Sequence, residues 1–108
     1  MAIPHLKSGE PTELALGTGL PGAKTMTLVK TSAMEVIRLV LLAGKEISEH
    51  KAPGEITVQC LEGKVLFTAH GEQRELAAGK FLHLSTGEPH ALKALDDSSL
   101  LVTILLGT

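Results

Sequence analysis

Short apolar segments follow one another from residue 25 to residue 106, and glycine, proline or a polar turn separates each from the next. Most of them alternate polar with apolar side chains or are rich in β-branched residues, which is the pattern of β-strands. Many short strands at close spacing predict an all-β barrel or sandwich. The expected strands cover residues 25–30, 34–42, 55–61, 64–69, 74–76, 80–84, 90–95 and 99–106.

Residues 1–24 differ in composition from the rest of the chain, because prolines and glycines interrupt them repeatedly. Such a stretch predicts an extended N-terminal arm with little helix. A chain of 108 residues has the length of one domain and can bury a core without disulfides. We therefore expect an arm over residues 1–24 and a single β-domain over residues 25–108.

The composition excludes several classes of partner. A net charge of −2 gives no basic surface for nucleic acid, and two Phe without any Trp or Tyr supply no stacking platform for bases. No apolar run approaches the roughly 20 residues needed to cross a bilayer. The N-terminus also lacks the pattern of a signal peptide. We expect a cytoplasmic protein that binds neither nucleic acid nor membrane.

Cys60 is the only cysteine, so the chain forms no internal disulfide. It lies in the alternating segment 55–61, and no cationic pattern in the sequence surrounds it. A lone cysteine of this kind usually packs as a small apolar side chain. We expect Cys60 to belong to the core and not to be a reactive thiol.

Two stretches that combine glycines with a single histidine share a layout. They resemble the two signature motifs of the cupin superfamily, in particular the small single-domain, cupin 2-like and RmlC-like members. The resemblance covers about residues 34–106 and implies a small jelly-roll β-barrel. Many such proteins bind a divalent metal in the barrel mouth, and many form dimers. The matching positions are Gly44, His50 and Gly63 in the first stretch, and Gly79, Gly87, Pro89 and His90 in the second.

The ligand set that the resemblance implies is incomplete in this chain. In metal-binding members the first motif resembles His-x-His-x-x-x-Glu, and the second motif contributes one histidine. His50 and His90 match the first and last of these four positions, while Ala52 and Ile56 stand at the other two and cannot bind a metal. The second motif also departs from the family pattern at Ser85 and Ala94.

Two imidazoles alone make a weak metal site, because catalytic sites usually have three protein ligands and an open position. His83 is the third candidate, and Glu55 would reach the cavity only if a β-bulge at Pro53-Gly54 reversed its direction. The resemblance implies a divalent ion such as Ni, Fe, Mn or Zn on His50 and His90, and His83, which is near His90 in the chain, is the candidate third ligand. The depleted set leaves open that no metal binds and that the histidines contact each other or solvent.

An apolar interior with a few polar groups is the usual form of a small-ligand site. Strand alternation places residues 56, 58 and 60 inside the barrel together with His50. Arg38, within the apolar segment 34–42, either extends to solvent or holds an anionic ligand in the cavity. The candidate ligand-binding residues are His50, His90 and Arg38, for a small ligand that is apolar or weakly anionic.

The sequence is compatible with three functions. The first, which the depleted ligand set favours, is a cupin that binds a small molecule as a sensor or accessory protein. The second is a metal-dependent enzyme of the dioxygenase or isomerase type, although no residue is assigned a catalytic role. The third is a non-catalytic dimeric scaffold with a filled interior. A homodimer is expected from the resemblance and from the arm, because residues 25–30 could pair with a partner's sheet edge.

Overall fold

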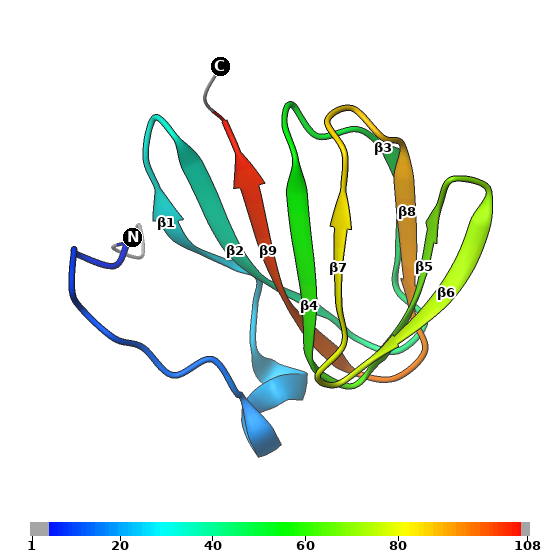
Figure 1. The fold of residues 1–108 in the computed structure, drawn as a ribbon. Helices are drawn as coiled ribbons and strands as arrows, with labels where there is room; N and C mark the ends of the chain where they lie inside the picture. The colour runs from blue at the N-terminus through cyan, green and yellow to red at the C-terminus, as the bar shows by residue number, and fades with distance from the viewer. Residues whose placement is uncertain (1–4, 107–108) are drawn as a thin grey trace.

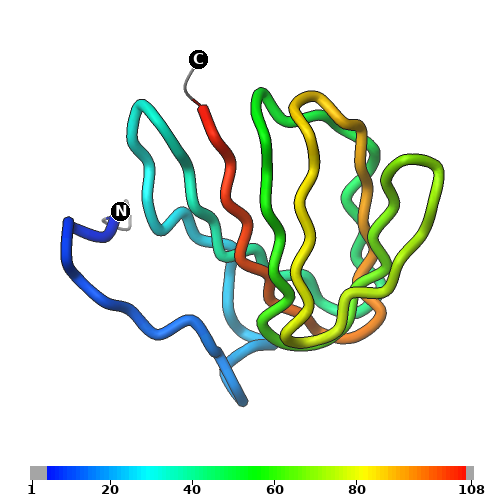
Figure 2. Tube along the Cα trace, in the orientation of Figure 1, coloured from blue at the N-terminus to red at the C-terminus, as the bar shows by residue number. Residues whose placement is uncertain are grey.

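The structure is a computed structural model that describes residues 5–106 (Figures 1 and 2). Its strands form two antiparallel sheets that face each other as a jelly-roll barrel, as the sequence predicts. The larger sheet has the order β1-β2-β9-β4-β7 and the smaller one the order β3-β8-β5-β6. The elements are η1 (Gly17–Gly22), β1 (Met26–Lys30), β2 (Met34–Leu41), β3 (Glu46–His50), β4 (Ile56–Glu62), β5 (Lys64–Ala69), β6 (Glu72–Ala77), β7 (Phe81–Leu84), β8 (His90–Ala94) and β9 (Ser98–Leu105).

Each expected strand has a counterpart, and the structure adds β3 to them. The β5–β6 hairpin is also tighter than expected, since β6 begins at Glu72. His70 and Gly71 form its two-residue turn, with φ of 53° and 72°. Two consecutive residues with positive φ suit a hairpin turn, because their twist matches that of the flanking strands. This turn fixes the register of β5 against β6.

The core lies between the two sheets and is built by strand alternation. In β4 the residues Ile56, Val58 and Cys60 are buried, while Thr57 and Gln59 between them are less so. Cys60 is fully buried, which confirms its place as a core side chain, and this burial raises the pKa of its thiol. Each fully buried aliphatic or aromatic side chain stabilises the fold by roughly 1.5–3 kcal/mol. The largest fully buried apolar side chains are Phe67, Leu100, Val58 and Val65.

The N-terminal arm lies to the side of β1 and passes through a short helix at the lower end of the strands before it enters β1 (Figure 1). The Leu6 amide donates to the Leu28 carbonyl of β1 at 2.8 Å, and the short 3₁₀ helix η1 follows the extended part. The carboxylate of Glu62 accepts the amides of Leu16 and Gly17 at 2.8 and 2.7 Å. The arm therefore docks on its own barrel, and its backbone amides donate to the Leu28 carbonyl and to the Glu62 carboxylate. The outermost parts of the expected segments, residues 1–4 and 107–108, lie outside the described residues.

Candidate ligand-binding site

His50 and His90 lie together at one end of the barrel. His50 ends β3 and His90 begins β8, and a bulge in the β3–β8 pairing makes them partners in register. Their ring centroids are 4.3 Å apart in an edge-to-face arrangement. His90 is buried and His50 is exposed at the mouth. The two motif histidines thus form one pair, as the sequence analysis requires of a shared site.

Both imidazoles are oriented by backbone carbonyls. His50 Nδ1 lies 3.0 Å from the Ser48 oxygen, and His90 Nδ1 lies 2.9 Å from the Glu88 oxygen. A carbonyl oxygen can only accept, so each Nδ1 carries the proton and donates it. In the neutral imidazole this leaves the Nε2 lone pair free. The pair therefore offers two Nε2 acceptors to whatever enters the mouth.

An apolar cavity of about 60 Å³ adjoins the histidine pair. The ring of Phe67 stacks on His90 with a centroid distance of 5.8 Å, so it forms one wall. The expectation that alternate residues of the strand 55–61 face inward holds for Ile56 and Val58, which both line this cavity. The other apolar lining residues are Leu39, Ile47, Leu92, Leu100 and Val102.

The described residues do not complete a metal site. Ile56 stands in the cavity wall, and Ala52 packs against the core, so neither of these two motif positions supplies a donor atom. Within residues 5–106, no three His, Cys, Asp or Glu side chains lie close enough together to hold a metal ion. A three-ligand catalytic centre of the ordinary kind therefore does not fit this donor set.

The structure does not bring His83 to the histidine pair. Its Nε2 lies 2.8 Å from a carboxylate oxygen of Glu55, and both side chains are about half exposed. His83 alternates on β7 with Leu82 and Leu84, whose register partners Val58 and Ile56 face the interior. His83 and Glu55 therefore form a hydrogen-bonded pair outside the histidine cavity, and Glu55 is not turned inward.

Arg38 is placed differently from both sequence interpretations. It pairs in register with Leu101, on the opposite face of the sheet from the cavity residue Leu39. It is only 7% exposed, and Nη1 donates to the Glu13 carbonyl of the arm at 3.3 Å. It thus neither extends to solvent nor reaches the cavity. Its Nε is buried without a hydrogen-bond partner in the described part of the chain.

Glu62 is the carboxylate that accepts hydrogen bonds from the arm in this region, and no pattern in the sequence singles it out. The amide of Leu16 holds the pKa of Glu62 below its usual range, and the Ser99 hydroxyl, the Gly17 amide and the charge of Arg38 act in the same direction. The Ser99 hydroxyl donates to Glu62 at 2.8 Å. Arg38 and Glu62 therefore belong to the docking of the arm and not to the ligand cavity.

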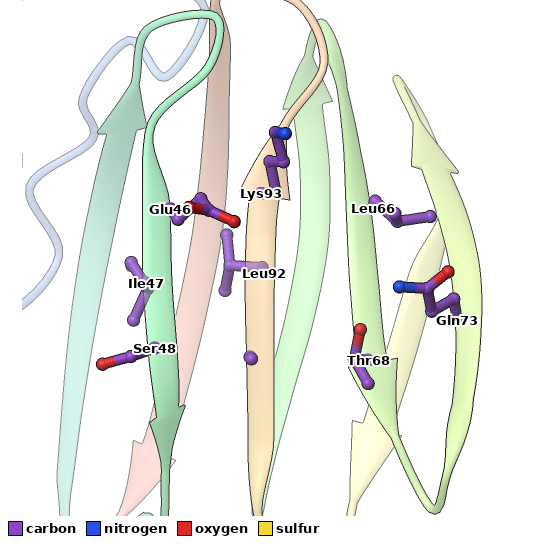
Figure 3. Close-up of a pocket in the computed structure, with 9 residues that line it drawn as sticks. Glu46, Ile47, Ser48, Leu66, Thr68, Gln73, Leu92 and Lys93 are labelled. Carbon is purple, nitrogen blue, oxygen red and sulfur yellow. The ribbon is translucent and has the colours of Figure 1, made fainter.

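Two larger hollows, of about 340 Å³ each, lie elsewhere on the barrel. One is an open groove on the outside of the smaller sheet, where Figure 3 shows Glu46, Lys93, Leu66, Thr68 and Gln73 along it. The other lies between β6 and β7, and Phe67 forms part of its wall. Phe67 is thus shared by this second hollow and the histidine cavity.

The fold and the site define a small jelly-roll barrel with two oriented imidazoles at the mouth of an apolar cavity. The sequence matches the family described as Cupin domain over residues 37–106, and the chain belongs to this family. No curated protein matches the chain. Among residues 5–106, no helix is long and apolar enough to cross a membrane.

Solved structures show the same fold at low sequence identity. A conserved protein of unknown function from Streptococcus pyogenes has a TM-score of 0.77 and 23% identity, covering 97% of this chain and 94% of that one. An RmlC-like cupin from Desulfovibrio desulfuricans has a TM-score of 0.70 and 22% identity, covering 96% and 100%. A cupin superfamily protein from Desulfitobacterium hafniense has a TM-score of 0.73 and 18% identity, covering 76% and 75%. The first two likenesses extend over the arm as well as the barrel.

Proposed function

We propose that this cupin binds a small organic ligand in the barrel, with His50 and His90 as the polar recognition groups. The observation that carries the proposal is the orientation of the two rings. Each Nδ1 is committed to a backbone carbonyl, so both Nε2 atoms are free acceptors beside apolar walls. An apolar pocket with a few oriented polar groups is typical of small-molecule sites.

The chemistry of the two imidazoles selects one property of the ligand. A group that meets two unprotonated Nε2 atoms has to donate a hydrogen bond, because two facing acceptors leave each other unsatisfied. A hydroxyl group donates its one hydrogen to one of the two Nε2 atoms, and it is small enough for the mouth. The proposal therefore predicts a ligand that carries a hydroxyl on an otherwise apolar end.

A thermal-shift screen of small alcohols, diols and hydroxy acids tests the proposal. We expect hits that stabilise the native protein and lose their effect in the His50→Ala/His90→Ala variant. Long-range proton–nitrogen correlation spectra should show that the hits shift Nε2 of His50 and His90. His5→Ala is the matched control, because His5 is exposed in the arm. Hits that bind the double variant equally well would overturn the proposal.

A metal-dependent enzyme is the second candidate, and one observation favours it. Metal-ligating histidines almost always donate their other ring N–H to a carbonyl or carboxylate, as both Nδ1 atoms do here. Elemental analysis of tag-free native protein beside the double variant decides between the two. Near-stoichiometric metal that is lost in the variant would favour this candidate. Absence of metal from both proteins after soaking would leave organic-ligand binding.

The cavity also distinguishes the ligand-binding proposal from the third function, a non-catalytic dimeric scaffold. A scaffold without a ligand predicts a filled interior. The apolar hollow beside His50 and His90 supports the ligand-binding proposal over that third function.

A further inference from the structure

The histidine cavity is too small to hold an organic ligand by itself. Its volume of about 60 Å³ has room for a few water molecules, whereas small-molecule sites usually measure roughly 300–1,000 Å³. The hollow between β6 and β7 measures about 340 Å³ and shares Phe67 with the histidine cavity. A ligand held by the histidines can therefore extend past Phe67 into this neighbouring space, along the inside of the smaller sheet.

Rows of paired residues on the inner face of the smaller sheet run from one space towards the other. Residues paired directly across neighbouring strands lie on the same face, so the pairs define rows across the inside of the sheet. The mouth row contains His50, His90, Ala69 and Glu72. The middle row contains Ile47, Leu92, Phe67 and Arg74. Each row runs from the histidine cavity to a charged side chain on β6, and two strand spacings separate His90 from Glu72 by roughly 10 Å.

The barrel is open at the side where these rows end. β6 and β7 are the edge strands of their sheets and are not hydrogen-bonded to each other. Apolar side chains form the walls of the opening, and polar ones surround it. The wall residues are Phe67, Ala69, Leu82 and Leu84, and the polar residues are His70, Glu72, Arg74 and His83.

The Arg74 guanidinium is the permanent cation at the opening, where each histidine has a carboxylate neighbour, Glu88 beside His70 and Glu55 beside His83. The Arg74 guanidinium has five N–H groups, and Glu72 is the one carboxylate among the lining residues. The two are paired with each other, but both side chains are well exposed. An exposed pair contributes about 0–1 kcal/mol, so a ligand carboxylate can replace Glu72 on the guanidinium and bind it through two parallel hydrogen bonds.

We propose that the ligand lies over Phe67 from the His50–His90 pair to the β6–β7 opening, where Arg74 binds its carboxylate. The ligand class is then an aliphatic hydroxy acid, with a hydroxyl at the histidines, an apolar middle on Phe67 and a carboxylate at Arg74. This inference rests on the proposed function for the hydroxyl end. The carboxylate end rests on the register and lining of the opening.

A different explanation exists for Arg74 and Glu72. Inward-pointing charges on an edge strand also prevent sheets from pairing edge to edge. That explanation requires no ligand, and it predicts that neutralising Arg74 changes aggregation and leaves small-molecule binding as it was. The two explanations are therefore separable by a binding measurement.

The test is an amide chemical-shift titration with ω-hydroxyhexanoate. We expect perturbations at His50 and His90 and also at Ala69, Arg74 and Leu82. The corresponding terminal diol, which lacks the carboxylate, should bind about tenfold more weakly, since a charge-assisted hydrogen bond is lost. Tighter binding of ω-aminohexanol than of the hydroxy acid would overturn the carboxylate assignment, because the opening would then select a cation.

Variants of Arg74 identify the carboxylate end. Arg74→Gln should lower the affinity for ω-hydroxyhexanoate about tenfold while leaving that for the diol unchanged. Because Arg74 is exposed, the variant should fold normally. Lys93→Gln is the matched control, since Lys93 is an exposed cation on the outer face of the same sheet (Figure 3). An unchanged affinity in Arg74→Gln would overturn the inference.

The same titration separates this inference from the proposed function. Perturbations confined to His50 and His90 would support the function and overturn the extension to Arg74. Perturbations at the β6–β7 opening that persist in the His50→Ala/His90→Ala variant would support the opening as a carboxylate site and overturn the role of the histidines. No perturbation anywhere at millimolar hydroxy acid would overturn the inference, and the function would then be judged by its own screen.

Discussion

Cys60 shows how one residue's chemistry is set by its position in the barrel. Its side chain faces the interior of β4, and its Sγ donates weakly to the Glu62 carbonyl at 3.4 Å. Burial raises the pKa of the thiol and therefore disfavours the reactive thiolate. The sulfur is chemically a core atom as long as the fold is intact.

We predict that a thiol reagent labels Cys60 more than about a thousandfold more slowly in the native protein than in denaturant. Labelling requires opening of the barrel. In a domain with about 5 kcal/mol of stability, less than about a thousandth of the molecules are open at any time. The measurement is the rate of colour release from a disulfide reagent at mildly alkaline pH. Equal rates in the folded and unfolded protein would contradict the placement of Cys60.

Ile56 is the residue that most directly prevents His50 and His90 from forming a three-ligand metal site. It is buried and lines the same cavity as His50 and His90. We predict that Ile56→Glu destabilises the metal-free protein by about 2–4 kcal/mol, because it buries an unpaired carboxylate. Two imidazoles and one carboxylate are a donor set for divalent metals, so Ni²⁺ or Fe²⁺ should recover the loss.

Denaturant melts of Ile56→Glu with and without metal measure this effect. Ile56→Gln is the control, since glutamine has the shape of glutamate without its charge. Metal should recover little of the stability that this variant loses. Stabilisation of both variants to the same degree would mean that the metal binds elsewhere.

The sequence predicted the histidine pair but not the surroundings of Arg38 or the position of Arg74. The segment 34–42 is apolar at almost every position, because the arm covers part of its outer face while its inner face is in the core. Alternation therefore could not show on which side Arg38 lies. The place of Arg74 on the inner face follows only from its register opposite Phe67. This pairing is between strands, so no local sequence pattern predicts it.

At the level of elements, the turn between β4 and β5 depends on Gly63. Its φ is +83°, and a Cβ there would overlap the Asp97 carbonyl and the Ser98 hydroxyl. We predict that Gly63→Ala destabilises the fold by about 3 kcal/mol or more, from backbone strain and overlap together. Urea unfolding measures the change.

Gly44 is a matched control for Gly63. Its φ is +88°, and a Cβ there meets nothing within 4 Å. Gly44→Ala should therefore cost only the strain of a left-handed alanine, about 1–2 kcal/mol. Equal losses in the two variants would show that the close approach at Gly63 contributes nothing.

The docking of the arm depends on a carboxylate and should respond to acid. Hydrogen bonds depress the pKa of Glu62 below its ordinary value of 4.5. A depressed pKa contributes stability that is fully present above the ordinary value and is lost as pH falls through the folded value. We predict that the contact of the arm with Glu62 weakens as pH falls below about 4.5 and is lost at the lower folded-state pKa, while the barrel remains folded.

Hydrogen exchange at the Leu16 and Gly17 amides measures this loss of contact, because both donate to Glu62. In Glu62→Gln the acid dependence of that exchange should disappear. Glu35→Gln is the control, as Glu35 forms a surface pair with Lys30 far from η1 in sequence. Acid-dependent exchange that persists in Glu62→Gln would assign the effect to another group.

Strand positions were largely predictable, and the exception has a physical cause. β4 alternates between apolar and polar residues, and β5 and β9 are runs rich in apolar residues, so all three are visible in the sequence. β3 carries mostly polar and exposed side chains, with Ile47 as its one apolar residue. Its position depends on pairing with β8, which is a long-range contact. The arm's 3₁₀ helix was likewise hidden by its glycines and proline.

For the molecule as a whole, the arm and the outer face of the larger sheet remain open to a partner. Residues 7–13 of the arm are exposed in the single chain. The outer positions of β2 and β9 include apolar residues at one end, where Met34 pairs in register with Leu105. Leu105 is 45% exposed, which is unusual for a large apolar side chain in a central strand.

We predict that the protein is a homodimer in which this outer face meets that of a second copy. A stable interface buries about 800 Å² per partner, which the β2–β9 face and the arm can supply together. Leu105→Glu should convert the dimer to a folded monomer, because it would bring two carboxylates into an apolar interface. Leu95→Glu is the matched control, since Leu95 is 40% exposed but lies in the β8–β9 turn. Light scattering after size exclusion gives the mass, and a native protein that elutes as a monomer would contradict the prediction.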